Sequence, residues 1–277
     1  MVRPELSTLL AELQKSRALL GAEELRQRQP GHAPTGLSTL DALLGGGLPV
    51  GKIVELQGRP GAGATAMAIR LLARFSSLGH SVALVDRPDA FEPRSAQEAG
   101  VDLSRLLWCR PVRFDDTAKA TDAILASGAF PLVVLDLAAP RHLAPPRSLL
   151  PAPGLGIDQP VPAPRRRPDA PWSQAHWVRL ARRAEAARAT LLVLAGGEAG
   201  AASACSATLE AVRGQARFVG QGPGRTFEGL EVSLRLVRNK LGLPPGLCQV
   251  VLEAPRHFPE PAPEPTPAVP LRARRHR

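Results

Sequence analysis

The stretch Glu55–Ala66, which reads ELQGRPGAGATA, decides how this chain is expected to fold. Gly58, Gly63 and Thr65 stand where the phosphate-binding pattern G-x-x-x-x-G-K-[ST] has its glycines and its hydroxyl. An apolar run precedes the loop and a helical pattern follows it. This order of strand, loop and helix places backbone N–H groups and the helix dipole around a phosphate. The stretch therefore predicts a nucleotide-binding turn, but Ala64 stands where the pattern has lysine.

The loop and one acidic residue make up the predicted ligand site. Thr65 offers the hydroxyl that would hold Mg²⁺, and Asp136 follows an apolar run where an acidic residue on the same metal is expected. The missing lysine would bridge the β and γ phosphates, so its loss weakens affinity by at least about tenfold and turnover by more. We expect weakly held ATP or ADP with Mg²⁺. The predicted nucleotide-binding residues are Gly58, Arg59, Pro60, Gly61, Ala62, Gly63, Ala64 and Thr65.

The same residues allow an alternative interpretation, in which the segment is a glycine-rich turn that only resembles a phosphate-binding loop. The three cysteines and six histidines show no metal-ligand spacing, so no protein-built metal centre is expected.

Strand and helix patterns alternate along the chain. Apolar runs at residues 53–57, 81–86, 106–109, 131–136 and 190–196 predict buried strands, and helical patterns separate them. Wholly apolar strands are typical of a parallel sheet covered on both faces. The fold class expected is therefore α/β, with a mostly parallel central sheet flanked by helices and preceded by an N-terminal helix. After the fifth run we expect a short helix near Leu209 and two further strands, at 230–240 and 247–254.

Composition divides the chain into three segments. Residues 1–33 are expected to form an amphipathic helix and a linker, and residues 34–254 the core domain. Within the core, residues 137–171 predict a long loop rich in proline and arginine, since proline blocks helix and central strand. Residues 255–277 are a basic, proline-rich tail that we expect to be disordered.

The charge balance favours a polyanionic partner. The net charge is +10 and the pI is about 10.9, which is typical of chains that contact nucleic acid. No apolar run is long enough to span a membrane, and the N-terminus has no cleavable apolar segment, so a cytoplasmic, nucleoid-associated protein is expected. Two groups of arginines are candidates for DNA contact; the alternative is that the first group lies in a solvated linker and the second on a surface helix. The DNA-contact candidates are Arg165, Arg166, Arg167, Arg179, Arg182 and Arg183.

Four segments resemble the RecA recombinase core, and they occur in the same order and spacing. They are residues 34–65, 82–111, 122–139 and 230–246, within a resemblance that covers about residues 34–253. The resemblance implies a RecA-like P-loop core. It also implies that Arg238 and Lys240, in the sequence VRNK, face the nucleotide of a neighbouring protomer.

Three catalytic positions of that family are changed in this sequence. Ala64 stands where the family has the loop lysine, and Pro88 where it has the catalytic glutamate. Gly196 and Gly197 stand where it has the sensor glutamine. These departures imply that no catalytic residue remains and that the chain is a degenerate ATPase, not an enzyme. The segments matching the two DNA-binding loops of the family, 137–171 and 196–206, are changed as well.

These departures are similar to those of the ImuA-type proteins, which are RecA-like and act in the DNA-damage response. That group works with a polymerase-like ImuB protein and an error-prone polymerase. The resemblance implies a non-catalytic adaptor in DNA repair, SOS damage tolerance and translesion mutagenesis. Its expected partners are RecA, an ImuB-like protein, DNA bound directly or through the complex, and further copies of itself, with no membrane.

Two other functions stay open at this point. The first is a divergent DNA-dependent ATPase or recombinase of the RecA family, with Arg59 or Arg70 as the replacement cation. The second is a KaiC-like regulator outside DNA metabolism.

Overall fold

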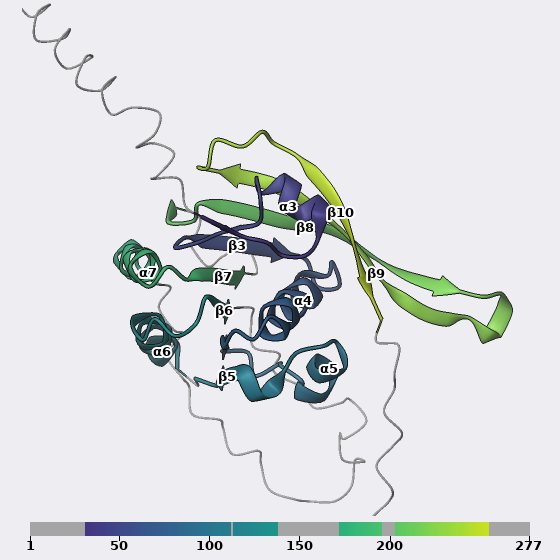
Figure 1. The fold of residues 1–277 in the computed structure, drawn as a ribbon, viewed down its shortest axis with the longest axis horizontal. Helices are drawn as coiled ribbons and strands as arrows, with labels where there is room; N and C mark the ends of the chain where they lie inside the picture. Colours follow the sequence, from purple (N-terminus) through teal and green to yellow (C-terminus); the bar gives the residue numbers. More distant parts are fainter. Residues whose placement is uncertain (1–30, 112, 138–171, 196–202, 255–277) are drawn as a thin grey trace, which may run out of the picture.

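The fold is built on a central sheet of eight strands (Figure 1). The computed structural model describes residues 31–111, 113–137, 172–195 and 203–254. From β8 to β5 all neighbouring strands are parallel, whereas β9 is antiparallel to both of its neighbours, β8 and β10. The expected α/β fold with a mostly parallel sheet is confirmed. In spatial order the strands are β10 (Leu247–Glu253), β9 (Thr226–Asn239), β8 (Ala207–Val219), β3 (Ile53–Gly58), β7 (Thr190–Ala195), β6 (Leu132–Asp136), β4 (Val82–Asp86) and β5 (Leu106–Cys109).

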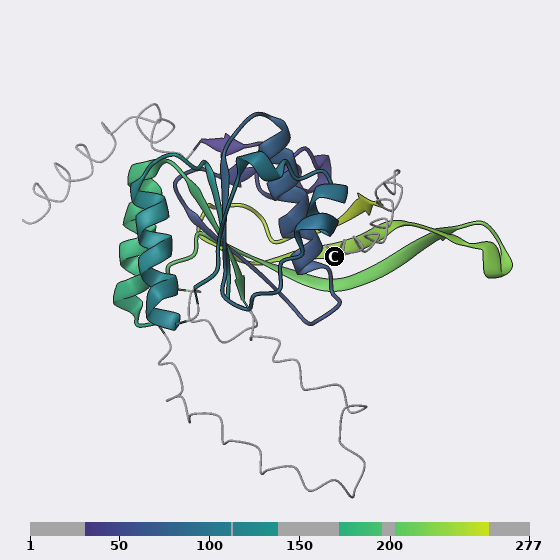
Figure 2. The ribbon, with the colours of Figure 1, turned by 90° about the horizontal axis from the view of Figure 1, so that it is seen from below.

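Helices cover both faces of this sheet (Figures 1 and 2). On one face lie α3 (Ser38–Leu43), α4 (Ala64–Ser77) and α5 (Pro93–Glu98), and on the other lie α6 (Phe114–Ala126) and α7 (Gln174–Ala187). A small antiparallel pair, β1 (His32–Ala33) with β2 (Leu48–Pro49), precedes β3. Two 3₁₀ turns, η1 (Leu103–Arg105) and η4 (Gly222–Gly224), complete the described elements.

The apolar runs of the sequence become strands that are buried on both sides. In β6, Leu132 and Val134 pack into the core under α4, while Val133 and Leu135 pack into the core under α6 and α7. All four are fully buried, which is why the run shows no alternation with polar residues.

The segment around Leu209 differs from its prediction, because it is a strand and not a helix. It belongs to the 13-residue strand β8, which pairs along its length with the 14-residue strand β9, with three shifts of register. Leu209 and Ala211 point into the core while Thr208 bonds a residue on the opposite side, a period of two that only a strand provides. The two strands continue past the rest of the sheet as a projecting ribbon (Figure 2).

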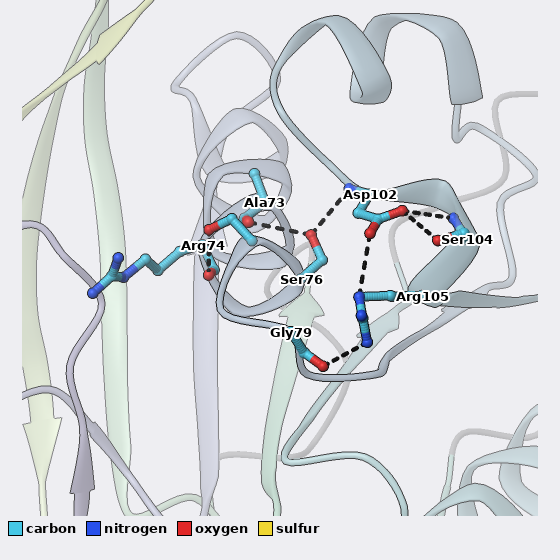
Figure 3. A network of polar contacts seen from close by, with 8 residues as sticks. Ala73, Arg74, Ser76, Gly79, Asp102, Ser104 and Arg105 are labelled. Atoms are coloured by element: carbon cyan, nitrogen blue, oxygen red, sulfur yellow. Dashed lines mark hydrogen bonds and ion pairs between the residues drawn. The ribbon is translucent and has the colours of Figure 1, made fainter.

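Polar contacts fix the end of α4 to the turn before β5 (Figure 3). The Ser76 hydroxyl accepts a hydrogen bond from the Asp102 backbone N–H at 3.1 Å, and Asp102 caps η1 by accepting from the backbone N–H of Ser104. Arg105 pairs with Asp102 at 3.3 Å and donates to the carbonyl of Gly79 at 2.7 Å. These bonds fix the turn that leads into β5, the edge strand of the sheet.

Several predictions fall outside the described residues. They concern the N-terminal helix, the loop predicted at 137–171 apart from its first residue, the glycines at 196 and 197, and the tail from 255. The three segments that we expect at 1–33, 34–254 and 255–277 therefore stay predictions. Across the described part of the chain, no helix is long and apolar enough to cross a membrane.

Candidate nucleotide-binding site

The glycine loop joins the end of β3 to the start of α4. Gly61 and Gly63 have positive φ values of 84° and 99°, and Gly63 is the N-cap of a helix that begins at Ala64. The loop closes on itself through a 2.9 Å hydrogen bond from the Ala62 N–H to the Arg59 carbonyl. The first turn of α4 contains no acidic side chain, so its positive dipole end is available to an anion.

Close packing against the ribbon explains two glycines near the loop. A Cβ on Gly63 would lie 2.5 Å from Val232 Cγ2 of β9. A Cβ on Gly214 of β8 would lie 2.6 Å from the carbonyl oxygen of Gly61. The ribbon thus braces the loop from one side, and the glycines have a structural role besides exposing backbone to a ligand.

Two aspartates end neighbouring strands on the same edge of the sheet. Asp86 and Asp136 are in register across β4 and β6, and both are largely buried. Asp86 accepts hydrogen bonds from the backbone N–H groups of Ala90 and Phe91 and from Nε1 of Trp108, at 3.0–3.1 Å. Asp86 therefore organises the turn after β4, and Asp136 ends the neighbouring strand at the same level.

Thr65 and Asp136 line one cavity of about 140 Å³ between α4, α5 and the strand ends. Most of its other lining residues are apolar, among them Ile69 and Leu72 of α4 and Phe91 from the turn after β4. A hydroxyl and a carboxylate are the oxygen ligands that Mg²⁺ takes when phosphates and waters complete its coordination. The residues present thus fit a magnesium-bound phosphate. Within the described residues no three His, Cys, Asp or Glu side chains form a metal cluster.

The charged side chains that line this cavity are the acids Asp86, Glu92 and Asp136, and no basic residue is among its lining residues. Pro88 lines it where the resemblance implies a glutamate, and it has neither a carboxylate nor a backbone N–H. The adjacent Asp89 pairs with Arg110 through two bonds of 2.6 and 2.7 Å. These hydrogen bonds hold the pKa of Asp89 below its ordinary value. Its carboxylate is thereby kept ionised and engaged with Arg110.

The remaining predicted residues lie in three places. On α7, Arg179 and Arg183 both pair with Asp122 of α6, at 3.3 and 3.2 Å, and Arg182 is exposed. Arg238 lies near the C-terminal end of β9 and Lys240 directly follows that strand, where its ammonium donates to the Ser203 carbonyl. Arg165, Arg166 and Arg167 are outside the described residues. The three arginines of α7 are thus on a helix that covers the face of the sheet opposite α4.

One buried acid was missed by the sequence reasoning. Glu55 lies in the middle of β3 with 4% of its surface exposed, and it accepts a 3.1 Å hydrogen bond from the Thr208 hydroxyl. Burial raises the pKa of Glu55, while Thr208 and the charge of Arg238 act in the opposite direction. The pKa of Cys205 is raised to about 12, mainly by burial of the thiol and to a lesser extent by the negative charge of Glu55. A charged residue inside an otherwise apolar strand was the available signal.

Comparisons with known proteins agree with this geometry. Residues 13–148 match the family described as RecA N-terminal domain. The chloroplastic DNA repair protein recA homolog 1 of Arabidopsis thaliana is 37% identical over 102 residues, which are 37% of this chain and 23% of that protein. Protein RecA of Acinetobacter baylyi is 38% identical over 103 residues, 37% of this chain and 30% of its own length. Protein RecA of Streptomyces ambofaciens is 36% identical over 104 residues, 37% and 28% respectively.

Over these partial regions the chain is similar to RecA proteins. The matched regions span less than a third of the length of these relatives. The expectation that this RecA-like chain is not an enzyme is contradicted, because its relatives are RecA proteins, which are DNA-dependent ATPases. The inference from Ala64, Pro88 and the glycines at 196 and 197 was wrong: the loss of these catalytic side chains lowers a rate without fixing it at zero.

Proposed function

We propose that this chain is a divergent RecA-like ATPase that acts in DNA repair. The observation that supports it most is the meeting of Thr65 and Asp136 in one cavity, beside a glycine loop that opens a helix. This arrangement offers backbone donors, a helix dipole, a hydroxyl and a carboxylate to a magnesium–nucleotide complex. Ala64 contributes no ammonium, so binding is weak and turnover slow.

Slow turnover suits a protein in which bound nucleotide controls binding to partner proteins, because the nucleotide-bound state then lasts long. We propose that the chain serves as an adaptor in SOS damage tolerance and translesion mutagenesis, binding RecA or an ImuB-like polymerase complex at the nucleoid in the cytoplasm. The ImuA-type resemblance supports this role, as do Arg238 and Lys240, which keep the basic pair at the end of β9. DNA is bound directly or through that complex, and further copies of the chain add to the assembly.

The nucleotide site is tested with a fluorescent ATP analogue and full-length protein in Mg²⁺. Ala64→Lys restores a charged donor to phosphate and should tighten binding by about tenfold or more. Asp136→Ala should weaken the Mg²⁺-dependent part of binding and lower ATP turnover, because the carboxylate on the metal is removed. Asp115→Ala, an exposed acid in the first turn of α6, is the matched control. Unchanged binding in both Ala64→Lys and Asp136→Ala would refute the site.

The adaptor role has a separate test. The tagged chain, recovered from cells after DNA damage, should retain RecA or a polymerase-family protein. Recovery should depend on nucleotide, and Arg238→Ala with Lys240→Ala should reduce it. Recovery of neither partner, from cells in which the chain is expressed and folded, would overturn the adaptor proposal while leaving the nucleotide site standing.

A further inference from the structure

The turn between β4 and α5 forms one wall of the nucleotide cavity. Pro88, Ala90 and Phe91 of this turn line the cavity together with Thr65 of the glycine loop. The Asp86 carboxylate accepts hydrogen bonds from the backbone N–H groups of Ala90 and Phe91, and so holds the second half of the turn. The shape of the cavity therefore depends on how firmly the rest of the turn is held.

Asp89 occupies a strained position in the same turn. Its φ of 53° lies in the left-handed region, which residues other than glycine rarely adopt. A conformation of this kind persists where surrounding contacts fix it. Arg110 supplies such contacts, because its Nε donates to one oxygen of the Asp89 carboxylate at 2.6 Å and its Nη2 donates to the other at 2.7 Å. Two parallel hydrogen bonds fix the orientation of both groups, so the Asp89–Arg110 pair holds the centre of the turn.

Strand β5 brings a second side chain to this turn. Arg110 directly follows β5, and its guanidinium lies 4.8 Å from the centre of the Trp108 ring. The Trp108 indole donates from Nε1 to Asp86 at 3.1 Å and packs edge-to-face against Phe91, with 5.3 Å between the ring centroids. Trp108 thus contacts residues at the two ends of the turn, while Arg110 contacts its centre.

From these contacts we infer that Arg110 is a positioning residue for the nucleotide site. Arg110 is not among the residues that line the cavity, and it acts on the site through Asp89. Because the Asp89–Arg110 pair fixes the turn in advance, nucleotide binding does not have to order that wall. A turn that spends part of its time out of place lowers the apparent affinity in proportion. The inference rests on the proposed function and adds to it the residue that holds one wall of the site.

A contribution to folding alone is the competing explanation for the pair. The Asp89 and Arg110 side chains are each 55% exposed. Exposed ion pairs contribute little to the free energy of unfolding, because water and salt screen the charges. Arg110→Ala should therefore leave the urea midpoint nearly unchanged, while it loosens the turn and weakens nucleotide binding.

The hold on the turn is measured first, in the full-length protein without nucleotide. Amide hydrogen exchange of Ala90 and Phe91 reports opening of the turn, because both N–H groups are bonded to Asp86. Exchange at these two amides should be about threefold faster or more in Arg110→Ala and in Asp89→Asn. Asparagine tolerates the left-handed region as aspartate does, so the second variant removes the charge without adding strain.

Arg105→Ala is the matched control. Arg105 lies in the turn at the other end of β5, and its ion pair with Asp102 is similarly exposed, at 45% and 42%. This variant should leave both the exchange rates and the nucleotide affinity as they are in the unmodified chain.

Nucleotide affinity is then measured with the fluorescent ATP analogue in Mg²⁺. Arg110→Ala and Asp89→Asn should each raise the dissociation constant by about three- to tenfold. Arg110→Lys keeps the charge but cannot form the two parallel bonds, so its affinity should lie between those of Arg110→Ala and the unmodified chain. The double variant Arg110→Ala with Asp89→Asn should bind no more weakly than the weaker single variant, because both changes remove the same pair.

The possible outcomes distinguish this role from the proposed function. Unchanged amide exchange in both single variants would show that the pair does not hold the turn, and the inference would be wrong. Faster exchange with nucleotide affinity equal to that of Arg105→Ala would overturn the positioning role alone, as would losses that add up in the double variant. Absence of nucleotide binding in the unmodified chain would overturn the proposed function and this role with it.

Discussion

At the scale of single residues, Glu55 is the side chain whose environment departs most from its sequence context. It stands in an apolar strand between Val193 of β7 and Thr208 of β8, with a raised pKa. A carboxyl that is harder to ionise in the folded chain binds more protons there than in the unfolded chain. Between its ordinary pKa of 4.5 and the raised value, its contribution to stability therefore falls as pH rises.

Glu55→Gln tests this sign. The amide has the same shape, can still accept from Thr208, and does not ionise. The free energy of unfolding of the variant, relative to the unmodified chain, should increase as pH rises from about 4.5 toward neutrality. Urea unfolding at a series of pH values gives this difference. A difference that stays constant, or falls with rising pH, contradicts the raised pKa.

At the scale of elements, the turn from β3 to α4 depends on a neighbour that is distant in sequence. Gly63 combines a φ of 99° with a 2.5 Å approach between Val232 and the place a Cβ would take. Gly61 has a φ of 84°, and a Cβ added to it would meet no atom within 4 Å. A side chain at Gly61 would therefore meet backbone strain alone, whereas one at Gly63 would meet both backbone strain and steric crowding.

Gly63→Ala and Gly61→Ala form a matched pair for this turn. Both substitutions force a side chain into an unfavourable φ, at a cost of the order of 1 kcal/mol. Gly63→Ala also drives a methyl group into Val232, so it should lower the free energy of unfolding by about 1–3 kcal/mol more than Gly61→Ala. Equal losses in urea unfolding would show that β9 does not press on the loop.

Element positions could be predicted wherever the pattern is local. The runs before Asp86 and Asp136, and the helix that follows the loop, agree with the structure because a buried strand or an amphipathic helix is visible in its own residues. The helix near Leu209 failed because Val212, Gln215 and Ala216 give a mixed pattern, in which pairing with β9 decides the outcome.

At the scale of the whole molecule, the sheet separates two apolar cores. Leu135 is fully buried in the core under α6 and α7, whereas Val251 is an exposed residue of the peripheral strand β10. Leu135→Ala should lower the free energy of unfolding by about 2–5 kcal/mol, because a cavity is left in a close-packed interior. Val251→Ala should change it by less than about 0.5 kcal/mol. If Leu135→Ala were equally mild in denaturant titrations, α6 and α7 would not cover that face.

The candidate site was predictable only in part. The glycine spacing and the aspartate after an apolar strand predicted the loop and Asp136, and the structure places Thr65 and Asp136 at one cavity. Three ion pairs could not be predicted, because they join elements far apart in the chain. They are Asp89 with Arg110, and Asp122 with both Arg179 and Arg183.

The sequence by itself determined the alternation of strands and helices from β3 to β7, the glycine turn and the loss of the loop lysine. Each of these depends on neighbouring residues, through backbone conformation and the period of apolar side chains. Tertiary structure alone decided that the β8–β9 ribbon braces the loop, that Glu55 is buried, and that Phe218 meets Phe227. These features depend on strand register, which is set by side chains meeting across the sheet and is not encoded in any single segment.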